Sequence, residues 1–346
     1  MDHLIDSIPV LIVPFVTCLV IAALHCYMGL HVLRRGVIFV DLALAQCAAL
    51  GAAFALFLVP MIWPESLQAP EEVVLSMASE QTLADQFELE DNEILLGAQA
   101  PTTAPADASH HVFSEDHHEH EIDHEHAEFT YGMSLLFALI GAVLLSLMRF
   151  KDERVPHEAM IGIIFVVCAA LSVLILSKAP HGHDKMEAML IGSILFVSWP
   201  QVIKMALLYL VLGIIHILMS RKFVAISNNI AAAEDRGINV KLWDCFFFAT
   251  FALMVTQSVT IAGVFVVFSY LIIPAACGSL FGKSFGSRLV IAWIIAVLTT
   301  VLGLLISAVW DMPTGSSLVS CFGAMLVVCV LIRMLIDKRV VSNAAS

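Results

Sequence analysis

Residues 261–281 read IAGVFVVFSYLIIPAACGSLF and contain no charged side chain. A helix that crosses a lipid bilayer needs about 20 predominantly apolar residues, so this stretch is long enough to span a membrane. The rest of the chain follows the same pattern, because 60% of its 346 residues are hydrophobic and only 14% are charged. Soluble domains carry about 25% charged residues. The sequence therefore predicts an all-α integral membrane protein.

The apolar residues form long blocks, and each block predicts a membrane-spanning helix. Spans are expected near 10–33, 36–59, 130–149, 158–177, 203–219, 243–258, 261–281, 289–309 and 316–336. The stretch 187–200 is also apolar, but Gly192 and Pro200 interrupt it. It predicts a half-helix or a re-entrant piece, which is tolerated where protein or a cavity surrounds it. We expect a polytopic helical bundle with eight, nine or ten spans.

Basic residues are concentrated in alternate connections between these spans. One side of the predicted membrane receives 14 of the 17 Lys and Arg residues: Arg34, Arg35, Arg149, Lys151, Arg154, Arg221, Lys222, Arg236, Lys241, Lys283, Arg288, Arg333, Lys338 and Arg339. Short loops rich in Lys and Arg stay in the cytoplasm. The pattern predicts an N-terminus outside and a C-terminus inside. The first apolar stretch lacks a basic leading region and a cleavage site, so we expect a retained span.

Three parts of the chain differ in composition. Residues 1–59 hold the first two predicted spans, and 130–340 hold the others with a cytoplasmic segment at 221–241. Residues 60–129 contain 17 of the 30 acidic residues and no Lys or Arg. Their composition predicts an external loop that is largely disordered. The net charge of −13 is thus local, and it indicates no nucleic-acid partner.

The end of the acidic segment is dense in histidine and reads HHVFSEDHHEHEIDHEHAE. It holds seven of the 14 histidines: His110, His111, His117, His118, His120, His124 and His126. Imidazole suits zinc, copper, nickel and iron, and the neighbouring carboxylates add charge for a divalent ion. The tract lacks zinc-finger spacing, so we expect several weak metal sites. The alternative is a solvated acidic linker.

Ionisable residues inside predicted spans are candidates for an ion path. Asp41 lies early in the second span, and Gln46 follows five residues later. Asp41 either serves the path or is a buried carboxylate with a local partner. His181 and His183 at the predicted outer mouth form either an entry site or a plain turn. Lone histidines such as His25 and His216 are more often hydrogen-bonded between helices.

Sequence motifs for enzymes are not supported. GSLFGKS at 278–284 looks like a phosphate-binding loop, but only three residues separate Gly278 and Gly282, where four are needed. The eight cysteines all lie in apolar segments without a CxxC pair, as expected for small buried side chains. We therefore expect no catalytic residues and no permanently bound cofactor.

Several segments together resemble the permease subunits of the zinc, manganese and iron ABC importers. They are HVLRRGVIFVDLALAQCAALGAAFA (31–55), IGIIFVVCAALSVLIL (161–176), LIGSILFVSW (190–199), IAGVFVVFSYLIIPAACGSLF (261–281) and DMPTGSSLVSCFGAMLVV (311–328). Their order and spacing cover most of 10–336, apart from the histidine-rich loop. Many zinc and manganese members carry an Asp and, four residues later, a His in the second helix. Aligned on Gly51, Gln46 replaces that His and Asp41 stands one position early.

The resemblance also assigns a role to SNNIAAAEDRGINVKLWD, residues 227–244. This segment is similar to the family's coupling helix, which docks on the ATP-binding subunit, and implies contacts by Ala233, Glu234 and Gly237. Its alanines favour a helix, and Gly237 is well placed to end one. An ordinary helical loop is the alternative interpretation.

As a whole, the resemblance implies a multi-pass permease in the cell (inner or plasma) membrane that works in pairs. Its implied partners are an ATP-binding subunit, an external metal-binding delivery protein and a second permease copy. The histidines favour zinc as the transported ion, with manganese or iron as alternatives. Two other classes stay open: a gradient-driven secondary metal transporter with a His-rich loop, and a metal sensor or scaffold.

Overall fold

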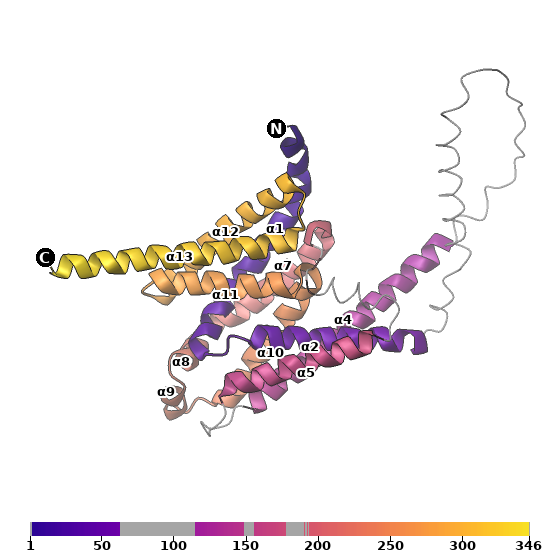
Figure 1. Ribbon diagram of the computed structural model, residues 1–346. Coiled ribbons are helices and arrows are strands. Elements are labelled where there is room, and N and C mark those ends of the chain that lie inside the picture. Colours follow the sequence, from indigo (N-terminus) through magenta and orange to yellow (C-terminus); the bar gives the residue numbers. More distant parts are fainter. Residues whose placement is uncertain are drawn as a thin grey trace, which may run out of the picture. The chain divides into compact units, whose positions relative to one another are not determined.

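The structure is a computed structural model that describes residues 2–62, 115–148, 156–177, 190, 192 and 194–345 (Figure 1). It divides into two compact units. One comprises Met1–Phe54 and Gly132–Ser346, and the other comprises Ala55–Tyr131. In the described residues, the first unit contains seven complete candidate spans and large parts of two others, so the structural argument below concerns this unit except where stated.

All regular structure in the described residues is helical. The elements are α1 (Asp2–Arg35), α2 (Val40–Ile62), α4 (Glu115–Leu147), α5 (His157–Leu176), the 3-10 turn η2 (Ile194–Phe196), α7 (Trp199–Leu218), α8 (Ser220–Asn228), α9 (Ile230–Asp235), α10 (Val240–Ala262), α11 (Val264–Phe281), α12 (Phe285–Trp310) and α13 (Thr314–Ala345). Among them, nine carry segments long and apolar enough to cross a membrane. This confirms the prediction of an all-α, multi-pass membrane protein.

Residues that break helices separate neighbouring spans. Gly263 adopts a φ of 78° between α10 and α11, a backbone conformation that residues with a side chain rarely adopt. Pro274 lies within α11, which continues through it. In the described residues, the apolar stretch 187–200 forms the turn η2 and the first residues of α7, which begins at Trp199. Gly192, with a φ of 73°, lies against the backbone of Ala262, so this short piece packs on the break between α10 and α11.

Helix α1 packs against α7, α8, α11 and α12, and α11, α12 and α13 pack against one another (Figure 1). The closest approach is at Gly29. A Cβ atom placed there would stand 1.9 Å from the carbonyl oxygen of Leu271 in α11. Only a residue without a side chain allows two helix backbones to come this near. Buried side chains such as Ile21, Met28, Tyr270 and Phe322 fill the surrounding core.

A second set of contacts joins α2 to α4 and α5. The rings of Phe54 and Phe137 are 5.7 Å apart between α2 and α4. Gly141 in α4 leaves room for the side chain of Cys47, because a Cβ atom there would stand 2.6 Å from its Sγ atom. The same Sγ atom lies 3.5 Å from the Sγ atom of Cys168 in α5. The eight cysteines are free thiols.

We predict that mild oxidation will link α2 to α5 through Cys47 and Cys168. Two copper(II) phenanthroline ions would each accept one electron from the two thiols, which lose two protons and form one disulfide. With a protease site inserted at residue 90, the cleaved chain should run as one band on a non-reducing gel and as two after reduction. A Cys168→Ser variant is the control. A linked band that persists in this variant would contradict the proposed packing of α2 and α5.

Large apolar side chains are exposed on several spans, including Val166 of α5, Leu207 of α7 and Leu331 of α13. Only 17% of the α5 span and 11% of the α13 span is buried within the described structure. Lipid tails are as apolar as leucine, so such faces are stable against hydrocarbon or another membrane subunit. The exposed apolar faces agree with the membrane location.

Candidate functional site

Asp41 lies in the first turn of α2, which begins at Val40. Its side chain is only 1% exposed, and its Oδ1 atom has no hydrogen-bond partner in the described residues. A buried carboxylate is costly unless a cation or a hydrogen-bond donor compensates it. Asp41 is therefore a candidate to bind a positive ion.

Gln46 is buried on the same helix. Five residues of an α-helix turn the chain by about 140° relative to Asp41. The pair therefore does not share one narrow face as residues four apart would. Within the described residues, no group of three or more His, Cys, Asp or Glu side chains has the arrangement of a metal site. The structure places both predicted path residues in α2 without bringing them into one site.

The histidines within the spans have structural partners. His25 Nδ1 lies 2.9 Å from the carbonyl oxygen of Ile21, and its Nε2 lies 3.3 Å from Ser258 Oγ in α10. His216 Nε2 lies 2.9 Å from Thr250 Oγ1, also in α10. These bonds tie α1 and α7 to α10, which is the interhelical role expected from the sequence.

The predicted histidine loop is partly a helix, because α4 begins at Glu115. Five of the histidines lie in α4: His117, His118, His120, His124 and His126. The other four predicted metal-site histidines, His110, His111, His181 and His183, lie outside the described residues.

The predicted coupling segment folds as two short helices, α8 and α9. Asn229 begins α9 by accepting a hydrogen bond from the Ala232 amide at 3.0 Å. Gly237 follows the helix with a φ of 76°, as its position in the sequence predicted. Ala233 is only 1% exposed and packs with Ile226 and Val240. Its side chain therefore anchors α9 to the chain itself and is not available to a partner.

Glu234 and Gly237 are exposed on this segment, together with Asp235 and Arg236. The described structure thus divides the three predicted coupling residues. Ala233 faces inward, whereas Glu234 and Gly237 lie on the surface. A partner protein that docks on α9 would contact a polar, charged surface. Buried apolar side chains lie beneath this surface.

A buried polar network near the coupling segment was not predicted. Arg35 at the end of α1 donates from Nη1 to Asp244 Oδ1 in α10 at 2.7 Å and from Nε to Ser227 Oγ in α8 at 3.0 Å. The Arg35 guanidinium also lies 3.9 Å from the ring centre of Phe247. His31 Nδ1 lies 2.9 Å from the same Ser227 hydroxyl. Three helices therefore meet through four polar side chains.

The sequence did carry a signal for this network. Asp244 stands at the start of an apolar span, just as Asp41 does, so the rule that singled out Asp41 applies to it as well. Its partner could not be identified from the sequence, because Arg35 lies 209 residues away.

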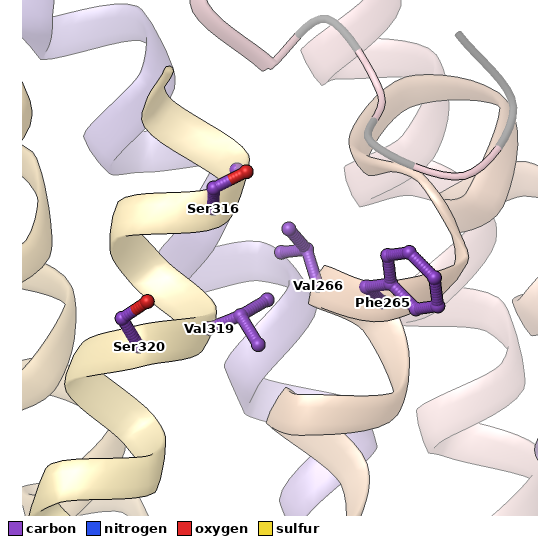
Figure 2. Close-up of a pocket in the computed structure, with 6 residues that line it drawn as sticks. Phe265, Val266, Ser316, Val319 and Ser320 are labelled. Atoms are coloured by element: carbon purple, nitrogen blue, oxygen red, sulfur yellow. The ribbon is translucent and has the colours of Figure 1, made fainter. Parts of the chain in front are cut away.

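A hollow of about 170 Å³ lies between α11 and α13 (Figure 2). Val266 and Phe265 extend from α11 on one side, and Val319, Ser316 and Ser320 extend from α13 on the other. No charged side chain lines it. A dehydrated metal ion needs charged or strongly polar ligands, so we do not assign this hollow to an ion path.

Comparisons with known proteins give one consistent picture. Residues 126–333 match the model of the ABC 3 transport family. The chain is 24% identical over 169 residues to the manganese transport system membrane protein MntC of Listeria monocytogenes, covering 49% of this chain and 60% of that protein. It is 27% identical over 176 residues to the high-affinity zinc uptake system membrane protein ZnuB of Haemophilus influenzae, covering 49% and 66%. The chain thus spans about 60% of the length of the curated relatives it matches.

Among solved structures, the chain resembles PsaBC from Streptococcus pneumoniae in complex with Fab. The TM-score is 0.63 at 16% sequence identity, and the match covers 94% of this chain and 93% of that one. This likeness extends over the spans on both sides of the acidic segment. It shows that the arrangement of helices is shared.

Proposed function

The chain belongs to the ABC 3 transport family, and from this premise we propose that it is the membrane-spanning permease subunit of an ATP-driven importer for a divalent metal ion. ATP hydrolysis takes place in a separate ATP-binding subunit, so the permease itself is not an enzyme. The ion is the cargo and not a resident cofactor. Relatives named for manganese, iron and zinc transport support this cargo class.

The observation that supports the proposal most directly is the way α8 and α9 fold and pack. A short helix with an exposed, charged edge at Glu234 and Arg236 rests on a buried apolar base between two spans. Such a helix is stable without a partner and still offers a rigid surface for docking. The ATP-binding subunit is the proposed occupant of this surface, with Glu234 and Gly237 at the contact.

The ion path passes Asp41 in this proposal. Its buried carboxylate lacks a hydrogen-bond partner at Oδ1 in the described residues, so a passing cation would supply the missing charge. Gln46 contributes a neutral oxygen further along α2. Zinc is the favoured cargo, because histidine suits it and α4 is rich in histidine. Manganese and iron are the alternatives that the experiments below separate.

We place the N-terminus outside and the C-terminus inside, as the distribution of Lys and Arg favours. In this orientation, the segments that contain the histidine-rich tract and the pair His181 and His183 belong to the side from which the ion arrives. An external metal-binding protein delivers the ion there. A second copy of the permease completes the pathway, and the exposed apolar faces of α5 and α13 are available for that copy or for lipid.

The histidines of α4 should bind metal weakly and should not be required for transport itself. Replacing His117, His120 and His124 with Asn keeps the side chains polar and uncharged but removes the imidazole ligands. We expect fewer zinc ions per purified permease in isothermal titration, with an unchanged maximal uptake rate. An unchanged zinc stoichiometry would show that these three histidines do not bind metal.

Co-purification from the native membrane tests the proposed function. The tagged chain should bring down an ATP-binding subunit, whose ATP turnover should respond to one delivery protein loaded with zinc, manganese or iron. The metal that gives the response names the cargo. A chain that purifies alone, and carries metal without an ATPase, would instead be a gradient-driven transporter.

A further inference from the structure

The buried network at the end of α1 connects the coupling segment to the spans. Ser227 lies in the last turn of α8, two residues before Asn229, which caps α9. The Ser227 hydroxyl holds two side chains of α1, His31 and Arg35. Arg34 adds a third link, since its Nη1 donates to Asn228 Oδ1 at 2.7 Å. The end of α8 is thus attached to the last turn of α1 at adjacent positions.

The hydrogen bonds at Ser227 fit one consistent arrangement. A serine hydroxyl has one donor and two acceptor sites. Its oxygen accepts from Arg35 Nε–H, and the hydroxyl shares a second hydrogen bond with His31 Nδ1, in which either atom can be the donor. The arginine in turn donates to Asp244. Because the guanidinium is planar and rigid, the positions of Ser227 and Asp244 are fixed relative to each other.

Burial makes this connection stiff. The side chains of Arg35 and Asp244 are 1% and 0% exposed, so water does not compete for their bond. A buried ion pair adds little net stability compared with apolar packing, because both charges lose their hydration. Its benefit is a defined geometry. Beyond this point, α1 is held tightly against α11, where Gly29 lies under the carbonyl of Leu271.

We propose that Ser227, Arg35 and Asp244 form a bridge that transmits movement of α8 and α9 to α1 and α10. The inference rests on the proposed function, in which the ATP-binding subunit moves α9. Ser227 and Arg35 are positioning residues here, since neither needs to touch the transported ion. When α8 shifts, the bridge moves the ends of α1 and α10 together, and the close packing at Gly29 passes the shift to α11.

The test uses the full complex of permease, ATP-binding subunit and loaded delivery protein in liposomes. Ser227→Ala removes the hydroxyl and both of its bonds without introducing a charge. Arg35→Lys keeps the charge beside Asp244 but lacks the fork that also reaches Ser227. Ser269→Ala is the matched control, because this buried hydroxyl bonds only within its own helix, to the Phe265 carbonyl at 2.8 Å. The readout is metal ions imported per ATP hydrolysed.

In Ser227→Ala, which loses two hydrogen bonds, we expect this ratio to fall about tenfold. Arg35→Lys loses only the bond to Ser227 and should lower the ratio by a smaller factor. The amount of ATP-binding subunit that co-purifies with each variant and the melting temperature of the complex should match those of the Ser269→Ala control. A merely structural role would lower uptake and ATP turnover together and leave the ratio unchanged, and that result overturns the bridge. A wild-type complex without ATP-dependent uptake overturns the proposed function and the bridge with it.

Discussion

Asp41→Asn is expected to abolish metal uptake while the permease stays folded and bound to its ATP-binding subunit. Asparagine has nearly the same shape as aspartate but no negative charge, so a cation loses its buried counter-charge. Altering the surroundings of a metal ligand already costs 10-fold to 100-fold in affinity or activity, and loss of the ligand's charge should cost about 100-fold or more. Initial rates of uptake of a radioactive ion into liposomes measure this effect.

The stability of the Asp41→Asn variant should equal or exceed that of the wild type. In the absence of the ion, a buried carboxylate without a full set of hydrogen-bond partners destabilises the fold. Burying a neutral amide at the same place costs less free energy. Asp311→Asn is the matched control. Asp311 is exposed and has a φ of 49°, which asparagine also tolerates. Wild-type uptake by Asp41→Asn would remove Asp41 from the ion path.

Gly29→Ala should prevent the normal packing of α1 on α11. The added Cβ atom would stand 1.9 Å from a backbone oxygen, and 3.0 Å from the Cβ atom of Ala275. A backbone atom cannot move aside as a side chain can, so the two helices must separate. We expect a loss of about 3 kcal/mol or more in the free energy of unfolding and a clear fall in melting temperature in detergent.

Gly162→Ala is the control for this substitution. Gly162 also lies inside a helix, α5, but nothing comes within 4 Å of the added atom. Alanine favours a helix over glycine by about 1 kcal/mol, so the control should be as stable as the wild type or slightly more stable. Equal melting temperatures for Gly29→Ala and Gly162→Ala would contradict the close crossing of α1 and α11.

Much of the fold could be predicted from the sequence, because the bilayer imposes a simple rule. Each span must be apolar over about 20 residues, and this alone located all nine candidate spans. Residues that constrain the backbone were also informative. Gly237 follows α9 with a positive φ, as its position in the sequence predicted, whereas Gly263 lies inside the predicted span 261–281 and in the structure separates α10 from α11. The sequence also predicted that the apolar stretch 187–200 would be interrupted and would not form one continuous helix.

The prediction was less accurate where it relied only on the amino-acid composition of a segment. The acidic, histidine-rich segment lacks an apolar stripe, so nothing indicated that α4 would begin as early as Glu115. Ala233 was assigned to a docking surface, although the same small apolar side chain fits the buried base of α9. Composition shows that a segment is polar or helical, but it does not show which side faces the chain.

Contacts between residues that are far apart in the chain could not be predicted from the sequence. In the sequence, Arg35 is one of many basic residues that orient the chain, and nothing distinguishes His31. Their meeting with Ser227 and Asp244 depends on how α1, α8 and α10 cross. Such a crossing is decided by packing over the whole length of the helices, and a single sequence does not record it.

The most direct test of the central claim is ATP-dependent uptake by the reconstituted complex. Liposomes would contain the permease with its ATP-binding subunit, with the loaded delivery protein on one side and ATP on the other. The account predicts accumulation of the delivered metal ion only when ATP is present, and no accumulation with the permease alone under an ion or proton gradient. Uptake by the permease alone, driven by a gradient and indifferent to ATP, would contradict it.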